Sequence, residues 1–328
     1  MLIDHYGRSI TYLRISLTDR CNLRCAYCIP NTSANWIPQE NLLTADEIIK
    51  VVKAAASLGV SKIRLTGGEP LIRTDVIEIV QRISAISEIK DIGLTTNAIL
   101  LEKLAKPLVD AGLNRVNISL DTLDPHKFHR ITRLGHFSKT WNGILAAENA
   151  GLLPIKLNTV VVGGLNDNEL PSLARLTVEH PWQVRFIELM PVGNQQDWGD
   201  DMPYGSDRYV SVQQMHKQLA DLHLEPIERA ESEGPARTFR IPGAPGTIGF
   251  ISPLGEHFCE SCNRLRLTAD GSLRACLLID GEISVRDILR KGGDITAIIQ
   301  QAVDSKPQGH ELALKHFPKT RRMSQIGG

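Results

Sequence analysis

The sequence predicts an α/β protein built on a parallel sheet with covering helices, followed by a smaller C-terminal α+β domain. From residue 12 to about residue 223, strand-like runs alternate with helix-like runs in six βα units, the order expected of a parallel sheet. After residue 224 the alternation stops, and charged residues are followed by prolines and glycines, a composition typical of an irregular connection. We therefore expect one domain over residues 1–224 and a second over residues 225–328.

Each predicted strand is short and apolar, and several are rich in β-branched residues, which favour extended backbone. The runs between the strands carry apolar residues at helical spacing. Thr44 is a suitable N-cap for the first predicted helix, and Thr74 is expected to begin the next helix in the same way. The predicted strands cover residues 13–17, 62–66, 91–95, 115–120, 155–162 and 183–189.

The composition argues against several classes of protein. The chain has 328 residues, with 37 Lys plus Arg and 37 Asp plus Glu, so no global field attracts nucleic acid or an anionic membrane. The first residues lack the charged-then-apolar order of a secretory signal, and no apolar run approaches membrane-spanning length. We therefore expect a cytoplasmic protein with no nucleic-acid or membrane partner. In that compartment clustered cysteines indicate metal ligation or redox chemistry.

All six cysteines fall into two groups of three. The first group has the spacing Cys-x3-Cys-x2-Cys directly after the first predicted strand. Three thiolates leave one iron of a four-iron cluster open, and a small ligand can bind there. A zinc site completed by a histidine remains the alternative for each group, with His257 as the candidate for the second. The N-terminal triad is Cys21, Cys25 and Cys28, and the C-terminal triad is Cys259, Cys262 and Cys276.

Three further features indicate ligand binding. Gly67-Gly68-Glu69-Pro70 follows the second predicted strand, where glycines let the backbone approach a ligand closely, although a tight βα turn has the same composition. Tyr27 is a candidate to stack on a molecule bound at the N-terminal triad. In Asn263-Arg264-Leu265-Arg266-Leu267 the arginines alternate with leucines, so both guanidinium groups would share one face of a strand and form a clamp suited to phosphate.

A bound nucleotide would depend on arginine and lysine side chains, because no Walker-type or dinucleotide-type glycine loop occurs in the sequence. Arg14, Arg64 and Lys156 lie on the first, second and fifth predicted strands. Successive residues of a strand point to opposite faces. The sequence alone therefore does not decide whether these three side chains reach one cavity.

The N-terminal triad resembles the hallmark of the radical S-adenosylmethionine (SAM) superfamily, in which this spacing follows the first strand of a partial (β/α)6 barrel. Over nearly its whole length the chain is similar to the GTP 3',8-cyclase family of molybdenum cofactor biosynthesis. The resemblance implies a partial (β/α)6 radical SAM barrel with a smaller C-terminal α+β domain that carries a second iron-sulfur cluster. The matching segments are residues 19–25, 118–123, 185–191 and 258–271 and the terminal Gly327-Gly328.

The resemblance implies two [4Fe-4S] clusters and SAM as cofactors. SAM would bind the open iron of the first cluster, and its one-electron cleavage would give a 5'-deoxyadenosyl radical. That radical would abstract hydrogen from C3' of the GTP ribose, and the resulting carbon radical would attack C8 of the same guanine. Reduction would yield 3',8-cyclo-7,8-dihydro-GTP, while the second cluster would bind the guanine base.

Site residues are implied in the same way. For SAM binding they are Tyr27, Gly68, Ser119 and Met190. For GTP binding they are Arg14, Arg64, Thr95, Lys156, Arg264, Leu265 and Arg266, with Arg185 nearby. Catalytic roles are implied for Cys21, Cys25, Cys28, Arg14, Arg264, Arg266, Gly327 and Gly328. Ala98 departs from the family's usual glycine and would cost local stability if the position requires a positive φ.

The implied partners are GTP as substrate, a reductant such as flavodoxin or ferredoxin, and a downstream cyclic pyranopterin monophosphate synthase, which need not bind physically. A homodimer is also considered. One alternative is another radical SAM enzyme that acts on a peptide, against which the paired arginines and the Gly-Gly tail argue. The other is a zinc-stabilised binding module, whose expected basic excess is missing.

Overall fold

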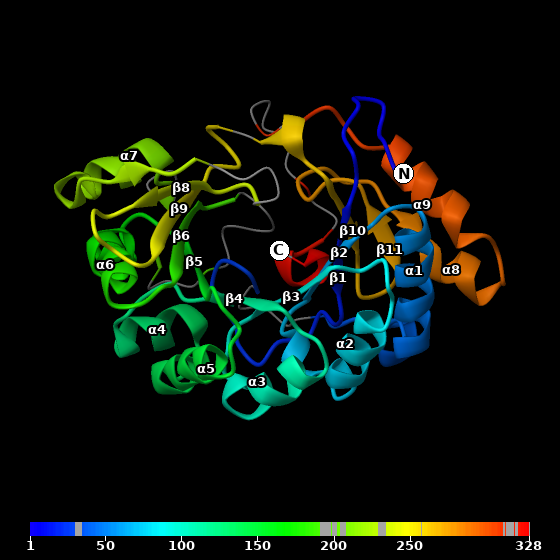
Figure 1. The fold of residues 1–328 in the computed structure, drawn as a ribbon, viewed down its shortest axis with the longest axis horizontal. Coiled ribbons are helices and arrows are strands. Elements are labelled where there is room, and N and C mark those ends of the chain that lie inside the picture. The colour runs from blue at the N-terminus through cyan, green and yellow to red at the C-terminus, as the bar shows by residue number, and fades with distance from the viewer. Residues whose placement is uncertain are drawn as a thin grey trace.

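A curved sheet forms the centre of the molecule, and helices cover its outer side (Figure 1). The computed structural model describes residues 1–29, 35–190, 198, 202–203, 208–228, 234–256, 258–310, 312, 318 and 321–327. All six predicted strands are confirmed, with each boundary within one residue of the expected one. They are β1 (Tyr12–Ser16), β2 (Lys62–Thr66), β3 (Asp91–Thr96), β4 (Arg115–Ser119), β5 (Lys156–Val161) and β6 (Gln183–Glu188).

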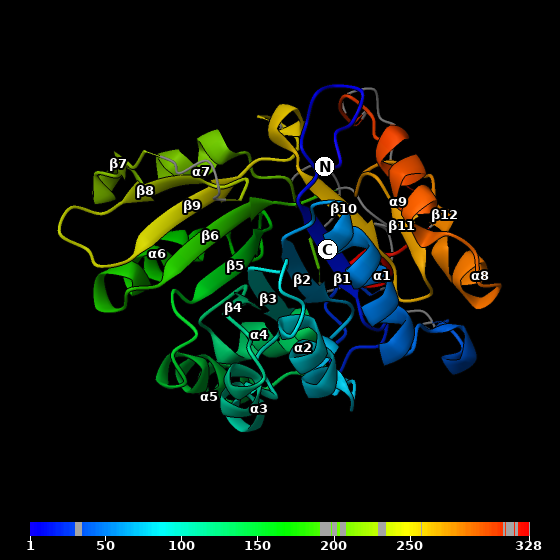
Figure 2. The ribbon, with the colours of Figure 1, turned by 45° about the vertical axis from the view of Figure 1, so that its right-hand side comes forward.

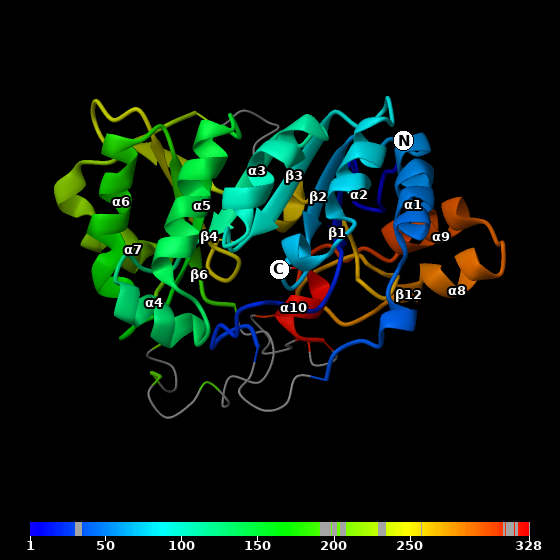
Figure 3. The same ribbon diagram turned by 90° about the horizontal axis from the view of Figure 1, so that it is seen from below.

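The helices that connect these strands lie on the outer side of the curve (Figure 3). Neighbouring strands in this series are parallel, which confirms the predicted βα order. The connecting helices are α1 (Ala45–Ser57), α2 (Val76–Ser84), α3 (Leu101–Asp110), α4 (Pro125–Thr132), α5 (Phe137–Asn149) and α6 (Leu170–Glu179).

The C-terminal third adds strands to both ends of the six-stranded series (Figure 2). At one end β9 pairs parallel with β6, and at the other β10 pairs parallel with β1. The strand order is β12-β11-β10-β1-β2-β3-β4-β5-β6-β9-β8-β7. The added strands are β7 (Glu225–Pro226), β8 (Arg237–Arg240), β9 (Thr247–Ile251), β10 (Arg264–Leu267), β11 (Ser272–Arg274) and β12 (Ile283–Ser284).

The segment expected to be irregular, residues 225–246, contains β7 and β8. Strand β8 forms because Arg237, Thr238 and Phe239 pair antiparallel with the following strand β9, and β7 pairs in turn with β8. Composition alone does not reveal these pairings. The strands on both sides of residue 224 thus belong to one sheet, and the division into domains at that residue stays a prediction. The remaining helices are α7 (Val212–Gln218), α8 (Val285–Arg290), α9 (Ile295–Asp304) and α10 (Met323–Ile326).

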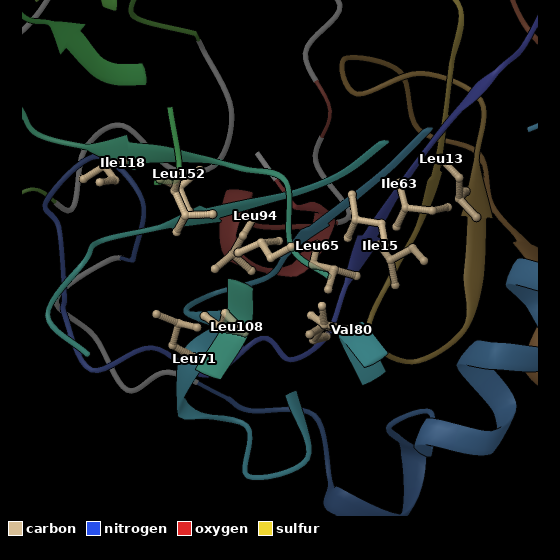
Figure 4. Packing of buried hydrophobic residues seen from close by; sticks show 14 of the residues in the cluster. Leu13, Ile15, Ile63, Leu65, Leu71, Val80, Leu94, Leu108, Ile118 and Leu152 are labelled. Carbon is tan, nitrogen blue, oxygen red and sulfur yellow. The ribbon is translucent and has the colours of Figure 1, made fainter. Parts of the chain in front are cut away.

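The hydrophobic core lies between the sheet and the outer helices. Leu65 on β2 and Leu94 on β3 are fully buried, as are Val80 on α2 and Leu108 on α3. Figure 4 shows the strand side chains facing those of the helices. Each such side chain contributes roughly 1.5–3 kcal/mol when it leaves water. This layer fixes the strands. Because successive side chains of a strand point to opposite faces, every second side chain is held on the inner side of the curve.

The start of the first helix agrees with the sequence, whereas the start of the second does not. Thr44 accepts a 3.2 Å hydrogen bond from the Glu47 amide, and Glu47 accepts one of 2.9 Å from the Thr44 amide, a reciprocal capping box. The expectation for Thr74 was wrong. Helix α2 begins at Val76 after Asp75 without a side-chain cap, because the Asp75 carboxylate binds Arg73 at 2.6 Å instead.

No helix in the part of the chain that the structure describes is both long and apolar enough to span a membrane.

Candidate active site

The three cysteines of the N-terminal triad lie in the loop after β1 and line one cavity of about 200 Å³. The loop is anchored on α4, since the amides of Arg24 and Ala26 each donate a 3.0 Å hydrogen bond to carbonyls at Thr132 and Ile131. All three thiols are free of disulfides. The predicted triad is therefore brought together at one cavity.

Burial raises the pKa of each thiol in this triad, to about 11 for Cys21 and about 12 for Cys28, and well above the usual value for Cys25. The Cys21 sulfur already accepts a 3.3 Å hydrogen bond from the Leu23 amide. Without a metal these groups are thiols, so metal binding must displace their protons. The loop therefore favours a metal centre that compensates the negative charges of several thiolates at once.

Gly67 and Gly68 are pressed against the backbone just before Cys21. The Gly68 amide donates a 2.7 Å hydrogen bond to the Thr18 carbonyl. A Cβ on Gly68 would lie 2.2 Å from the Arg20 carbonyl oxygen. Gly68 also lines the cavity of the N-terminal triad. Its contact with a ligand there stays a prediction. The structural reason for the missing side chain is this packing against the cysteine loop.

Three buried carboxyl groups also line this cavity, those of Glu69, Asp121 and Glu188, and sequence reasoning did not assign any of them. Glu69 accepts hydrogen bonds from Thr96 Oγ1 at 2.7 Å and from the Asn97 amide at 2.8 Å. Burial raises the pKa of Glu69 to about 7. Asp121 accepts a 2.6 Å hydrogen bond from the Tyr27 hydroxyl, and burial raises its pKa to about 6. Tyr27 is thus fixed by Asp121 at the cavity wall. Ser119 and Met190 also line this cavity.

A second cavity of about 500 Å³ lies inside the curve of the sheet and is strongly cationic. Among the described residues that line it there is no Asp or Glu. Such a wall with no acidic side chains concentrates anions. The basic residues in the lining are Arg14, Lys62, Arg64, Arg115, Lys156, Arg185, Arg264 and Arg266.

The pairing of three parallel strands places three of these arginines in one row. Arg14 on β1 is in register with Arg266 on β10 and with Arg64 on β2. Residues in register on adjacent parallel strands point to the same face. Burial lowers the pKa of Arg14 to about 10 and holds that of Arg266 well below its usual value, with the neighbouring arginines acting in the same direction. The row is thus an array of buried cations that a polyphosphate would neutralise.

Arg64 is held in this row by two residues that sequence reasoning missed. Its Nε donates a 3.0 Å hydrogen bond to the Tyr12 hydroxyl. Its guanidinium lies over Gly93, where an added Cβ would come within 2.6 Å of the Arg64 carbon Cζ. Burial raises the pKa of Tyr12, but the surrounding Arg64, Arg14 and Arg264 outweigh it and bring the pKa to about 7.

Three buried side-chain oxygen atoms in the same cavity have no hydrogen-bond partner in the described part of the chain: Thr95 Oγ1, Asn117 Oδ1 and Asn158 Oδ1. An unsatisfied buried polar group costs about 1–3 kcal/mol. These atoms sit on β3, β4 and β5, and Thr95 is in register with Asn117. Thr95 was expected from the sequence, whereas Asn117 and Asn158 were not. They are the groups that a bound polar ligand would satisfy.

The substrate contact expected of Leu265 stays a prediction. Its side chain is fully buried in the hydrophobic core and does not line the cavity. The reason is the alternation along β10, which turns Arg264 and Arg266 inward and Leu265 outward. Any contact of Leu265 with substrate is therefore left to its backbone.

The C-terminal triad lines a third cavity, of about 70 Å³. Cys276 accepts a 3.4 Å hydrogen bond from the Leu278 amide, and Cys262 accepts one of 3.5 Å from Lys306 Nζ. Burial raises the pKa of Cys262, but Lys306 and Arg264 outweigh it and hold the pKa below its usual range. Burial raises the pKa of Cys259. His257, the zinc-ligand candidate of the alternative interpretation, lies outside the described residues.

The three cavities form a continuous series. Thr95, Asn158, Ile187 and Met190 line both the cavity of the N-terminal triad and the cationic cavity. Arg264, Arg266 and Phe258 line both the cationic cavity and that of the C-terminal triad. The cationic cavity therefore lies between the two cysteine triads.

The C-terminal tail enters this series of cavities. Helix α10 lies within the curve of the strands (Figure 1), and its residues Met323 and Ser324 line the cavity of the N-terminal triad. Arg266 Nη1 donates a 2.6 Å hydrogen bond to the Gly327 carbonyl. Gly327 is thus brought to the arginine row, whereas Gly328 lies outside the described residues.

The residues present fit iron-sulfur clusters better than single metal ions. Each triad has three free thiols at one cavity. In the described part of the chain, however, no three His, Cys, Asp or Glu side chains are close enough together to hold one metal ion. A four-iron cluster takes each thiolate on a different iron, so its ligands stand farther apart than those of zinc. The donor set and its spacing favour a cluster at each triad.

The parallel barrel-like sheet with a cysteine loop after β1 defines a radical SAM protein, here with a second cysteine triad. Residues 15–177 match the Radical SAM superfamily model, and residues 182–312 match the Molybdenum Cofactor Synthesis C model. The chain belongs to the GTP 3',8-cyclase family. It is 45% identical over 338 residues to the GTP 3',8-cyclase of Listeria monocytogenes, covering 100% of this chain and 99% of that protein.

Another relative and a solved structure agree with this. The GTP 3',8-cyclase of Pelotomaculum thermopropionicum is 47% identical over 330 residues, covering 99% of each chain. The crystal structure of Streptococcus suis SuiB bound to S-adenosylmethionine has a TM-score of 0.60 at 15% identity and covers 89% of this chain and 68% of that one. At that identity the likeness shows the fold alone, and it supports the predicted radical SAM architecture.

Proposed function

We propose that this chain converts GTP to 3',8-cyclo-7,8-dihydro-GTP, the first step of molybdenum cofactor biosynthesis, with SAM and two [4Fe-4S] clusters. One observation carries the assignment of the substrate site: the row of Arg266, Arg14 and Arg64 lines a cavity that lies between two cysteine triads. A triphosphate is the part of GTP that such a row binds. The length of the triphosphate sets the distance of the nucleoside from the arginines.

The cofactors are assigned to the two triads. Cys21, Cys25 and Cys28 would hold the cluster that binds SAM, and Cys259, Cys262 and Cys276 would hold the second cluster. When bound, SAM would supply on one-electron cleavage the 5'-deoxyadenosyl radical that removes hydrogen from C3' of the ribose. The C3' radical would then bond to C8, and a second electron and a proton would complete the 7,8-dihydro product.

The chain's own residues hold the reactants in place. Tyr27, fixed by Asp121, closes one wall of the SAM cavity, and Gly68, Ser119 and Met190 line it. Reacting atoms must be held about 3–3.5 Å apart for an efficient intramolecular reaction. Because Thr95, Asn158 and Met190 are shared by both cavities, they are placed to set the position of the ribose against SAM.

The remaining assigned residues bind the nucleotide and exclude water. Lys156 on β5 and Arg264 on β10 also line this cavity and add charge to the arginine row. The tail, held by Arg266 at Gly327, enters at the cavity where water would compete with the radical. We propose Gly328 as a further residue of this tail.

The partners beyond GTP remain proposals as well. A reductant such as flavodoxin or ferredoxin would supply both electrons, one for SAM cleavage and one for the cyclised nucleotide radical, and a cyclic pyranopterin monophosphate synthase would take the product in the cytoplasm. A homodimer is a further proposal. The reductant can be tested directly, since it must support product formation in place of dithionite.

The test of the function is anaerobic reconstitution followed by assay. We expect about eight irons and as many sulfides per chain, and 5'-deoxyadenosine together with cyclised nucleotide after incubation with SAM, dithionite and GTP. Cys276→Ala should keep SAM cleavage and lose the cyclised product. Zinc without sulfide would refute the clusters, and SAM cleavage without cyclised GTP in the unaltered protein would refute the substrate.

A further inference from the structure

Lys306 is a buried cation beside the C-terminal triad, only 4% exposed. It follows α9 by two residues, and its side chain reaches back toward β10. An ammonium group has three N–H donors and no acceptor. Lys306 Nζ donates to the Arg264 carbonyl at 2.9 Å, to the Ala275 carbonyl at 2.8 Å and to the Cys262 sulfur at 3.5 Å. All three donors are thus used, and each partner is an acceptor.

These three partners lie on the two segments that carry cluster ligands. Arg264 follows Cys262 by two residues, and Ala275 directly precedes Cys276. A single ammonium therefore ties the segment of one ligand to the segment of another. It also touches the sulfur that one of those segments supplies.

The residues after Lys306 complete this arrangement around the remaining ligand. The Arg8 guanidinium donates to the Pro307 carbonyl at 2.5 Å and to the Gln308 carbonyl at 2.9 Å. It also donates to the carbonyl of Cys259 at 2.7 Å. Arg8 thus holds the chain just after Lys306 against the third ligand, and Asp4 in turn binds Arg8 at 2.6 Å. Lys306 is therefore held both by the contacts of its own ammonium group and by the contacts of Arg8 with the two residues that follow it.

A charge is not needed merely to tie two carbonyls together. Burying an ammonium costs several kcal/mol unless nearby acceptors and negative charge compensate it. Neutral donors would bind the same two carbonyls at less cost. The third partner explains the charge, because a hydrogen bond or positive charge at a ligand sulfur stabilises the electron-rich state of an iron-sulfur cluster.

We propose that Lys306 is a positioning residue for the second cluster and raises its reduction potential through the contact with the Cys262 sulfur. In the step concerned, one electron from an external low-potential reductant enters the cluster. No bond breaks, and Lys306 keeps its proton. The added negative charge is stabilised by the adjacent ammonium. This inference rests on the second cluster of the proposed function.

The test uses the reconstituted full-length protein and a redox titration followed by electron paramagnetic resonance. The variants are Lys306→Met and Lys306→Gln, which remove the charge, and Lys306→Arg, which keeps it. A Cys21→Ala/Cys25→Ala/Cys28→Ala variant identifies the signal of the second cluster. The matched control is Lys90→Met, at an exposed lysine whose ammonium donates to the Ser87 carbonyl at 2.6 Å.

We expect the potential of the second cluster to fall in Lys306→Met and Lys306→Gln and to stay near the original value in Lys306→Arg and Lys90→Met, with the first cluster unchanged. Loss of half the iron and sulfide in the neutral variants, with retention in Lys306→Arg, would also support the proposal. An unchanged potential in the neutral variants would overturn it, and so would loss of the cluster in Lys306→Arg as well. If the unaltered protein takes up one cluster only, the proposed function fails instead.

Discussion

Arg266 Nη1 donates a 2.6 Å hydrogen bond to the carbonyl of Gly327, which joins the middle of β10 to the C-terminal tail. Gly327 has φ 65 and a left-handed backbone, and a Cβ there would lie 2.5 Å from Thr66 Cγ2. The tail can make this contact only because the residue has no side chain. The arginine row and the tail are therefore parts of one site.

Gly327→Ala should displace the tail and lower the rate of product formation. The left-handed conformation alone costs a residue with a Cβ about 1–2 kcal/mol, so we expect about a tenfold loss or more. The measurement is the rate of cyclised nucleotide formation, with cluster content and SAM binding unchanged. Gly151→Ala is the control, since Gly151 has φ 84 but open space around the added Cβ. Equal rates in both variants would contradict the tail's role.

Arg14→Ala should weaken GTP binding much more than guanosine binding. A hydrogen bond to a charged group contributes about 1.5–3 kcal/mol, equivalent to roughly 10- to 150-fold in affinity. Calorimetry with GTP, GDP and guanosine measures the difference. Arg82→Ala is the control, because Arg82 forms surface ion pairs with Asp46 and Glu78. If guanosine binding fell as much as GTP binding, Arg14 would not be a phosphate ligand.

The sequence predicted the strands well because their signals are local. Short apolar runs between helical periodicities located the six strands β1 to β6, and alternation in β10 identified Arg264 and Arg266 as neighbours on one face. The same alternation, applied strictly, also turns the Leu265 side chain away from the cavity. That residue was carried over from the family resemblance rather than from the strand pattern.

What the sequence could not provide depends on long-range pairing. The parallel pairing of β10 with β1 brings Arg266 beside Arg14, and no local pattern encodes the register between such distant segments. Asn117, Lys62 and Tyr12 reach the cavity for the same reason. Lys306 carries no motif at all. It acquires its position from α9 and from the Arg8 contacts with Pro307 and Gln308.

Asn117→Leu should weaken GTP binding while leaving the ligand-free protein as stable or more stable. In the described structure Asn117 Oδ1 is buried without a partner, so its removal relieves a desolvation penalty of about 1–3 kcal/mol. Chemical denaturation and GTP titration measure the two effects. Asn114→Leu is the matched control, because Asn114 Oδ1 accepts a 2.7 Å hydrogen bond from the Ile92 amide. Asn114→Leu should therefore lose stability, and an equal loss in Asn117→Leu would argue against a ligand-binding oxygen.

Ala98→Gly should raise the free energy of unfolding by up to about 1 kcal/mol. Ala98 has φ 66, as the departure from glycine suggested, and relief of that conformation is worth about 1–2 kcal/mol. Loss of its fully buried methyl group offsets about 0.8 kcal/mol. Ala105→Gly in helix α3 is the control and should destabilise by about 1 kcal/mol. Equal destabilisation by both changes would show that Ala98 carries no strain.

Tyr12 should make the stability of the ligand-free protein depend on pH. Burial raises its pKa, but Arg64, Arg14 and Arg264 outweigh that effect and bring it to about 7 from the usual 10.0. Lys62, in register on β2, faces the same region. Because the folded state releases the proton more readily than the unfolded state, this stabilisation is absent below about pH 7, grows as the pH rises, and is complete above about pH 10.

The test compares the protein with Tyr12→Phe, which removes only the hydroxyl. Denaturation between about pH 7 and pH 10, the range in which the two states bind different numbers of protons, should show the unaltered protein gaining stability over the variant. Tyrosinate absorbance of the folded protein should rise around pH 7 and fall when GTP is added, because the triphosphate competes with the phenolate for Arg64 and Arg14. Parallel stability curves for the two proteins, with no change in absorbance, would show that Tyr12 stays protonated in the arginine row.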